Sequence, residues 1–317
     1  MRAPPFLALL PRLPRLPMLA HLLGTTLATF VSTHSLLVLV LLMLLAPYWL
    51  GPVLVRLTSK SSDAPQFEPF DGSADREPPP VTAHIARATG SLAGEGFRTA
   101  ADLVLHGHMD NIVTRVRLFE NPATDEAAIA AGVYTLAGEL GAMTMLVEFS
   151  TEFRDGSSRM TGNSPRPGVY ARRPDRTIER FPEMADAASL CRVHRALLRR
   201  HHAPRSVAPS RYRTAPARGL AEGMVREMEG QVAAGYLWKD AAARAYRPTL
   251  KGAVLMCWKL LPPAAGLRRA AGRRRAAKLL RELGDWNQPH QPKTSDSAAS
   301  PRSVTTAQSG HAFSSSR

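Results

Sequence analysis

The sequence predicts an α+β fold: an N-terminal transmembrane helix, then a small antiparallel sheet flanked by helices, then a basic helical region. Three observations lead to this prediction. One long uncharged segment lies near the N-terminus, several segments in the middle alternate apolar and polar residues, and arginine and alanine dominate the last part of the chain.

The uncharged segment covers residues 22–55 and contains a run, 36–45, made only of Leu, Val and Met. A helix that crosses a bilayer needs about 20 mostly apolar residues. Tyr48 and Trp49 follow the run, and aromatic side chains favour the headgroup region, so we expect the span at residues 27–49. A secretory signal peptide has a shorter apolar core and a small-residue cleavage site, which favours an uncleaved anchor here.

The basic residues that flank this span leave its orientation open. Cytoplasmic flanks are enriched in Lys and Arg, so a chain that starts at Met1 slightly favours a cytoplasmic N-terminus, whereas a start at Met18 reverses the preference. Low cysteine content is consistent with a reducing compartment, but it does not distinguish the cytoplasm from the periplasm. We expect a single-pass membrane protein in which the side of the soluble domain stays open, with a slight preference for the cytoplasm. The flanking residues are Arg2, Arg12, Arg15, Arg56 and Lys60.

Small hydroxyl residues gather in the first half of the span, between Thr25 and Ser35. Such residues let transmembrane helices pack closely and form hydrogen bonds across an interface, so this face is a candidate contact with other membrane proteins. His34 lies on it, and an ionisable residue inside a membrane is a functional candidate. The simpler interpretation places these residues in the membrane–water interface.

The whole chain has 317 residues and a net charge of +15. Its two cysteines, Cys191 and Cys257, exclude a disulfide framework and a four-cysteine metal site. Low apolar content near the C-terminus favours disorder there. We divide the chain into a Pro/Arg-rich leader (1–26), the transmembrane helix (27–49), an acidic Pro-rich linker (61–80), an α+β domain (81–203), a helical basic region (204–286) and a disordered tail (287–317).

Alternating apolar and polar residues predict the strands of the α+β domain. In the first strand, alternation places Phe97, Leu103 and Leu105 on one face. Residues 127–136 fit a helix or a strand, and Asp155-Gly156 predicts a hairpin. Short turns between consecutive strands favour an antiparallel sheet. We expect strands over residues 97–106, 111–119, 143–153, 157–162 and 177–181.

Helical spacing of apolar residues predicts the flanking helices. Asp186 is expected to cap a helix whose apolar stripe contains Leu190, Val193 and Leu197. Residues 235–250 predict a turn or small hairpin. The apolar segment 253–261 is too short to span a membrane, so it predicts an interfacial or buried helix. The expected helices cover residues 81–93, 187–203, 219–234, 253–261 and 266–283.

Candidate catalytic residues are few. The polar face of the sheet would carry Glu148 and Glu152, which could act as an acid–base pair, or could form salt bridges across strands with Arg115 and Arg117. His194, His201 and His202 indicate a basic helix end, where cations suit the helix dipole. The sequence contains no P-loop, no Gly-x-Ser-x-Gly elbow and no His-Glu-x-x-His helix.

His106 and His108 form the most metal-like pair, because alternate residues of a strand share a face. A zinc site needs three or four ligands, and no second cluster accompanies the pair. We therefore predict no metal and no cofactor, and keep both histidines as candidate acid–base groups beside Glu148 and Glu152.

The densest basic cluster lies within 14 residues that contain no acid. A basic amphipathic helix suits an anionic membrane surface, and each basic residue near such a surface contributes about 1 kcal/mol. Arginine also attracts nucleic-acid phosphates, and residues 234–252 resemble the wing of winged-helix domains, but without a helix-turn-helix before them. The cluster consists of Arg268, Arg269, Arg273, Arg274, Arg275, Lys278 and Arg281.

These features predict a non-enzymatic binding or scaffolding module that is anchored in the membrane and contacts membrane lipid through its basic helix. A membrane-tethered enzyme acting on a lipid-linked or anionic substrate is the alternative. A membrane-tethered nucleic-acid-binding protein is the second alternative and the less favoured one.

Overall fold

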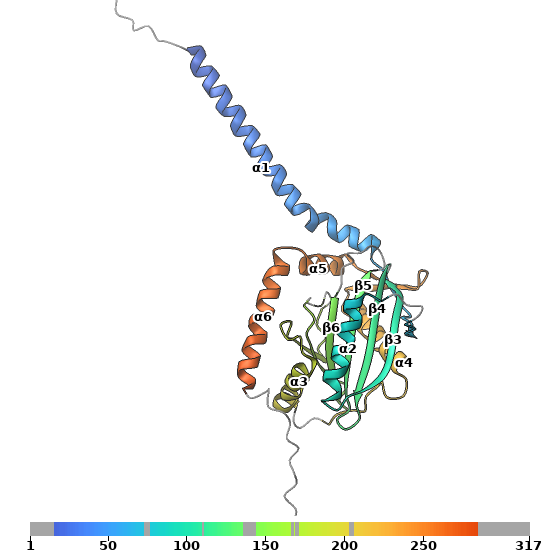
Figure 1. Cartoon of the computed structure of the whole chain (residues 1–317). Coiled ribbons are helices and arrows are strands. Elements are labelled where there is room, and N and C mark those ends of the chain that lie inside the picture. The colour runs from blue at the N-terminus through green and yellow to red at the C-terminus, as the bar shows by residue number, and fades with distance from the viewer. Residues whose placement is uncertain are drawn as a thin grey trace, which may run out of the picture. The chain divides into compact units, whose positions relative to one another are not determined.

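The computed structural model describes residues 16–72, 77–109, 111–135, 144–165, 168, 171–202 and 206–284. They belong to one compact unit, Met1–Asn287, with the α+β architecture shown in Figure 1. The helices are α1 (Leu16–Thr58), α2 (Pro79–Ala93), α3 (Ala187–His202), α4 (Pro216–Ala233), α5 (Leu250–Leu260) and α6 (Ala264–Leu283). The strands are β1 (Ser61–Ser62), β2 (Phe67–Pro69), β3 (Arg98–Met109), β4 (Ile112–Asn121), β5 (Glu126–Thr135), β6 (Thr144–Glu152), β7 (Ser158–Gly162), β8 (Arg176–Arg180), β9 (Leu237–Asp240) and β10 (Ala245–Pro248).

Seven strands form the main sheet in the order β2-β3-β4-β5-β6-β7-β8. All neighbours are antiparallel except β7 and β8, which pair in parallel with Ser158 opposite Arg176. The predicted hairpin at Asp155-Gly156 is confirmed, and Gly156 has the positive φ of 81° that favours glycine. The ambiguous segment forms a strand over residues 127–135, as part of β5. A smaller sheet contains β1, β10 and β9, which confirms the predicted small hairpin.

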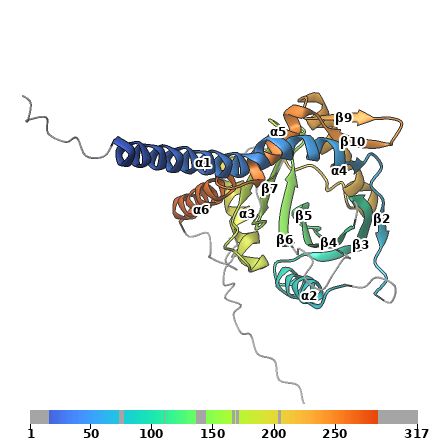
Figure 2. The ribbon, with the colours of Figure 1, turned by 90° about the horizontal axis from the view of Figure 1, so that it is seen from above.

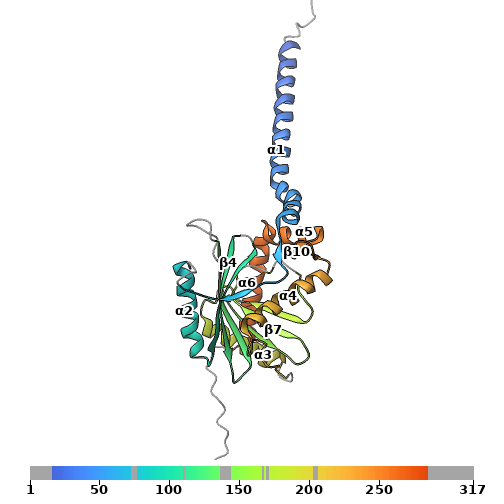
Figure 3. The same ribbon diagram turned by 90° about the vertical axis from the view of Figure 1, so that its right-hand side faces the viewer.

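Helices cover both faces of the main sheet. Val81 and Ile85 of α2 pack with Val147 and Phe149 of β6 in the main core, to which α3 also contributes. Helix α4 lies on the other face, as Figure 3 shows, and contacts β2, β3 and the hairpin strand β9. Seen from above in Figure 2, the sheet curves, with α2 on its outer side.

The expected salt bridges between the arginines of β4 and the glutamates of β6 are wrong. Through the intervening strand β5, the register places Arg117 on the face of Val147 rather than on that of Glu148. Arg115 and Arg117 instead bind Asp102 on the neighbouring strand β3. Alternation therefore gave the two faces of β4 and β6 correctly, but not the alignment of faces between these strands.

The expected single apolar face of the first strand is also divided. A β-bulge shifts the register between Thr99 and Ala101, and one extra residue moves the following side chains to the opposite face. Phe97 packs in the main core with α2. Leu103 and Leu105, which are equally buried, lie beyond the bulge on the α4 side.

Helix α3 begins as predicted, with the Asp186 carboxylate accepting a hydrogen bond from the Ser189 amide at 2.8 Å. The prediction that His194 belongs to a basic helix end is wrong. His194 lies four residues after Leu190, on the apolar stripe, and is fully buried. Its two ring nitrogens lie 2.9 and 2.8 Å from the hydroxyls of Thr151 and Thr161.

Helix α1 contains the 24-residue segment Ser35–Thr58, which is long and apolar enough to cross a membrane. Only 6% of its apolar stretch is buried against the rest of the protein. Membrane anchors and signal sequences both contain such helices. It is the one segment of this kind in the part of the chain that the structure describes. Pro47 and Pro52 lie inside the helix, and Figure 1 shows it changing direction over its last turns.

Some predictions fall outside the described residues. These are the leader before residue 16, the tail after residue 284, and the side chains of the Thr25–Ser35 face up to His34. The side chain of His108 also lies outside them.

Candidate functional site

Glu148 and Glu152 lie together, as their shared strand face predicted. Both line a cavity of about 300 Å³ between β6, β7 and α4. Cavities of this size are at the lower end of those that hold small ligands. The segment before α4 closes one side with Arg211 and Tyr212. A Cβ atom at Gly219 would lie 2.9 Å from the Arg211 carbonyl oxygen, so this glycine lets α4 approach the segment closely.

Glu148 has an unusual environment within this cavity. Among the residues that the structure describes, its carboxylate has no hydrogen bond and no salt bridge. Burial raises the pKa of Glu148, the charges of Arg176 and Arg180 oppose this shift, and Glu227 adds to it. Burial also raises the pKa of the neighbouring Tyr212. Glu148 is therefore the candidate proton donor or acceptor of the cavity.

The other carboxylates of the cavity are already paired. Glu152 forms a salt bridge with Arg211, and Glu227 binds Arg176 at 2.8 Å and also accepts a hydrogen bond from the Gln231 amide. These contacts hold their charges in fixed positions, so the structure leaves Glu148 rather than the Glu148–Glu152 pair as the candidate reactive group.

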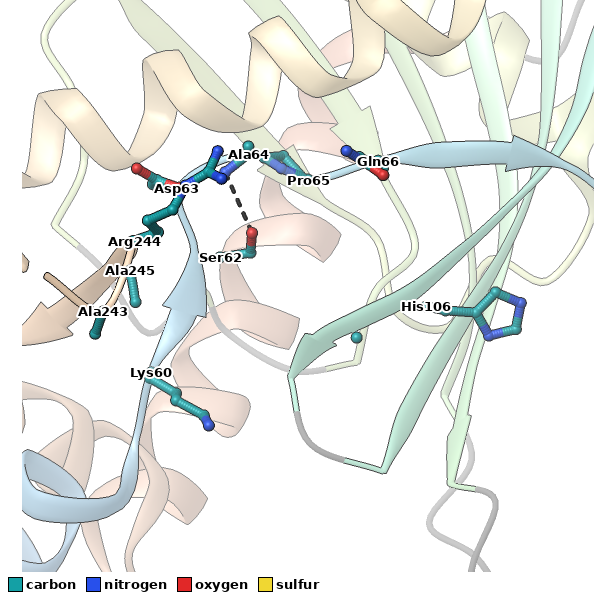
Figure 4. A pocket seen from close by; sticks show the side chains of 11 residues that line it. Lys60, Ser62, Asp63, Ala64, Pro65, Gln66, His106, Ala243, Arg244 and Ala245 are labelled. Atoms are coloured by element: carbon teal, nitrogen blue, oxygen red, sulfur yellow. Dashed lines mark hydrogen bonds and ion pairs between the residues drawn. The ribbon is translucent and has the colours of Figure 1, made fainter. Parts of the chain in front are cut away.

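His106 lies elsewhere. It lines a second cavity of about 460 Å³, with Lys60 and Asp63 on the opposite wall. Figure 4 shows the imidazole directed away from those two side chains. Within the described ranges, no group of three or more His, Cys, Asp or Glu side chains is arranged to hold a metal ion. The structure does not bring His106 to the Glu148 cavity.

A second candidate site is the surface formed by the end of α1 and by α5, which we call the α1–α5 surface. The two helices pack together, with the rings of Tyr48 and Trp258 at 6.3 Å in an edge-to-face arrangement. Large apolar side chains nevertheless remain exposed on both helices, and Trp49 and Trp258 are 76% and 57% exposed. The other exposed apolar residues are Leu50, Val53, Leu54, Leu57, Leu250, Val254 and Leu260.

Helix α6 carries the predicted basic cluster directly after α5. Arg275 binds Glu179 at 2.9 Å, and Lys278 lies 3.8 Å from Glu282. The apolar residues of its second half, among them Ala276 and Leu280, pack on the main core, so they are not available to a bilayer. The remaining cluster residues have no carboxylate within 4.0 Å in the described part of the chain, and these are Arg268, Arg269, Arg273, Arg274 and Arg281.

Sequence reasoning missed the groups that complete both sites. Tyr212 reaches the Glu148 cavity, and Lys259, Arg172 and Arg180 gather beside the first turns of α6. One signal was present, because Lys259 interrupts an otherwise apolar helix. A lysine kept inside an apolar segment has a high desolvation cost, which favours a specific role.

The fold and these sites define the protein as an α+β domain attached to a long apolar helix. No protein-family model matches the chain, and neither a curated protein nor a solved structure shows significant similarity to it. Its function is therefore argued from its own residues.

Proposed function

We propose that the protein is a single-pass, membrane-anchored binding module whose α1–α5 surface and the first turns of the basic helix α6 lie against an anionic membrane surface. In this arrangement residues 27–49 form the anchor. The side chains of α5 enter the headgroup region, and Arg268 and Arg269 at the start of α6 face anionic lipid.

The packing of α5 against the end of α1 is the observation that carries this proposal. An anchor whose last turns are bound to a second helix brings that helix to the membrane surface. The exposed apolar residues of α5 then leave water, as those of an interfacial helix do, and Trp258 reaches the depth that tryptophan favours. Large exposed apolar patches on soluble surfaces usually mark interaction sites.

The basic residues strengthen the same interpretation. Arg268 and Arg269 follow α5 by fewer than ten residues, so they lie next to the proposed contact. Because α1 already holds the chain at the bilayer, even weak contacts gain a high effective concentration. A scaffold of this kind would present the main sheet at a fixed distance from the membrane.

Spin-label accessibility tests the proposal on the full-length chain in lipid nanodiscs. A label at Val254→Cys should be more accessible to oxygen than to a water-soluble nickel complex, because Val254 would contact lipid. A label at Glu222→Cys is the matched control, since Glu222 is exposed on α4. Equal, water-like accessibility at both positions would show that α5 does not touch the membrane. The native Cys191 and Cys257 are buried and should not take the label.

A second candidate function, a membrane-tethered enzyme acting on a lipid-linked or anionic substrate, is favoured by Glu148. A raised pKa and the lack of a fixed partner suit a general acid or base. Mass spectrometry of the full-length protein incubated with phosphorylated and lipid-linked compounds would test it. Turnover should disappear in Glu148→Gln and persist in Glu222→Gln, a change on the exposed face of α4. Turnover that survives Glu148→Gln would exclude this role.

A further inference from the structure

A groove of about 700 Å³ runs between the edge strand β8 and helix α6. Six arginines line it, and two glutamates, Glu179 and Glu183, are the acids among its lining residues. Arginine side chains therefore set the electrostatic character of the groove. The arginines are Arg172, Arg180, Arg268, Arg269, Arg273 and Arg275.

Most of these arginines lack an acidic partner. Arg275 binds Glu179 at 2.9 Å. The other five have no carboxylate within 4.0 Å anywhere in the part of the chain that the structure describes. Arg218, on the exposed face of α4, is by contrast paired with Glu222 at 2.7 Å. Unpaired guanidinium groups concentrated in one groove indicate a site for an anion from outside the chain.

Lys259 of α5 increases this concentration of positive charge. It is 7% exposed, and its ammonium group lies 3.3 Å from the carbonyl oxygen of Gly168. Arg180 approaches the same glycine, because a Cβ atom there would lie 3.3 Å from its guanidinium. Burial, together with the charges of Arg268, Arg172 and Arg180, lowers the pKa of Lys259 to about 8. The charges of Arg268, Arg172 and Arg180 therefore lie close enough to Lys259 to add to the effect of burial.

Phosphate chemistry fits this arrangement. A guanidinium group donates two parallel hydrogen bonds to phosphate oxygens, and charge-assisted bonds of this kind are stronger than neutral ones. Arg180 comes from the sheet and Arg268 from α6, so the two can approach one anion from opposite walls. The start of α6 adds the positive end of a 20-residue helix.

We infer that the β8–α6 groove binds a phosphomonoester group, held between Arg180 and Arg268 with Arg172 beside them. Two sources share this chemistry: the headgroup of an anionic lipid and a soluble phosphate compound. The lipid source rests on the proposed membrane contact, whereas the soluble source does not. A phosphate dianion would offset the mutual repulsion of the arginines and of Lys259.

Isothermal titration calorimetry of the full-length protein in detergent micelles tests this inference with three probes. Inorganic phosphate represents the soluble source, dihexanoyl phosphatidic acid the lipid source, and dihexanoyl phosphatidylcholine is the control without a phosphomonoester. We expect phosphatidic acid to bind and phosphatidylcholine not to bind. Binding of phosphate as tight as that of phosphatidic acid would assign the site to soluble compounds. No binding of either anion at millimolar concentration would overturn the inference.

Two variants locate the site. Arg180→Gln and Arg268→Gln should each weaken anion binding by about tenfold or more, since each removes charge-assisted hydrogen bonds. Arg268 is exposed, so its variant keeps the test valid if Arg180→Gln fails to fold. Arg218→Gln and Arg244→Gln, which remove exposed charges elsewhere, should change the affinity less than twofold. Equal losses in all four variants would show a non-specific charge effect and contradict the inference.

Failure of this inference and failure of the proposed function are distinguishable. The spin-label measurement at Val254 reports on the membrane contact of α5 and does not require an occupied groove. A lipid-exposed label together with absent anion binding would retain the membrane contact and remove the groove site.

Discussion

Removal of the Asp102 carboxylate should destabilise the domain strongly. Asp102 binds the guanidinium groups of both Arg115 and Arg117, the latter at 2.6 Å. Arg115 is 2% exposed, and Asp102→Ala would leave its charge buried with Glu77 at 3.5 Å and a Leu103 carbonyl oxygen at 3.3 Å. Burial raises the pKa of Asp102, but the hydrogen bonds from the two arginines outweigh it, so the net pKa is lowered and the group is charged at neutral pH.

The expected loss of unfolding free energy in Asp102→Ala follows from these contacts. Breaking a buried ion pair by removing one partner costs about 3–5 kcal/mol. The Asp102 side chain is 30% exposed, and Arg115 keeps two weaker contacts, so we expect the lower end, about 3 kcal/mol. For a domain of this size that loss corresponds to a fall in Tm of about 6–12 °C.

Urea unfolding of the full-length protein in detergent, followed by near-ultraviolet circular dichroism, measures this loss. Glu222→Ala removes an exposed i,i+4 partner of Arg218 and should change the unfolding free energy by about 0.5 kcal/mol or less. The double variant Asp102→Ala/Arg115→Met should be more stable than Asp102→Ala alone, because it removes the stranded charge. If Asp102→Ala unfolds within about 0.5 kcal/mol of the wild type, the buried ion-pair reasoning is refuted.

Three further predictions test the α5 region. Gly51→Cys should form a disulfide with Cys257 under mild oxidation, since a Cβ atom at position 51 would lie 3.2 Å from the Cys257 sulfur. Peptide mapping should find no such link in the Val53→Cys control, because Val53 belongs to the exposed α1–α5 surface. Gly252→Ala should lower the unfolding free energy by about 3 kcal/mol in urea titrations, because the new methyl group would lie 2.0 Å from a carbonyl oxygen; wild-type stability would contradict the close packing. The lowered pKa of Lys259, about 8, means that the folded protein binds fewer protons at this residue than the unfolded chain does above that pH. The unfolding free energy of the wild type should therefore rise between about pH 8 and 10 relative to that of Lys259→Met. Parallel pH profiles of the two proteins would exclude the lowered pKa.

Local sequence patterns predicted most elements of the fold. Alternation located β6 and β7, and helical spacing located α3, because these patterns depend on neighbours within a few residues. Relations between distant segments were not predictable in this way. The bulge near Ala101 and the parallel pairing of β8 depend on register, which no local pattern encodes. His194 was predicted to belong to a basic helix end because His201 and His202 follow it in the sequence. Its spacing from Leu190 places it on the buried apolar stripe instead.

In the candidate sites, too, relations between nearby residues were predictable, and relations between distant segments were not. Glu148 and Glu152 share a strand face, so their common cavity follows from alternation. Tyr212 reaches that cavity from a segment about sixty residues later. The groove arginines come from β8 and α6, which lie far apart in the chain. The basic cluster was visible in the sequence, but only the fold shows which of its members lack acidic partners.

The junction between α1 and the domain has a mechanical consequence. Only Ser59 and Lys60 separate the last turn of α1 from β1, and β1 pairs at once with β10. The helix is thus connected to the small sheet without a flexible linker. If α1 anchors the protein in a bilayer, as proposed, this short connection and the packing of α1 on α5 would limit how far the domain can swing relative to the helix. A partner bound elsewhere on the domain would then stay within a narrow range of heights above the lipid.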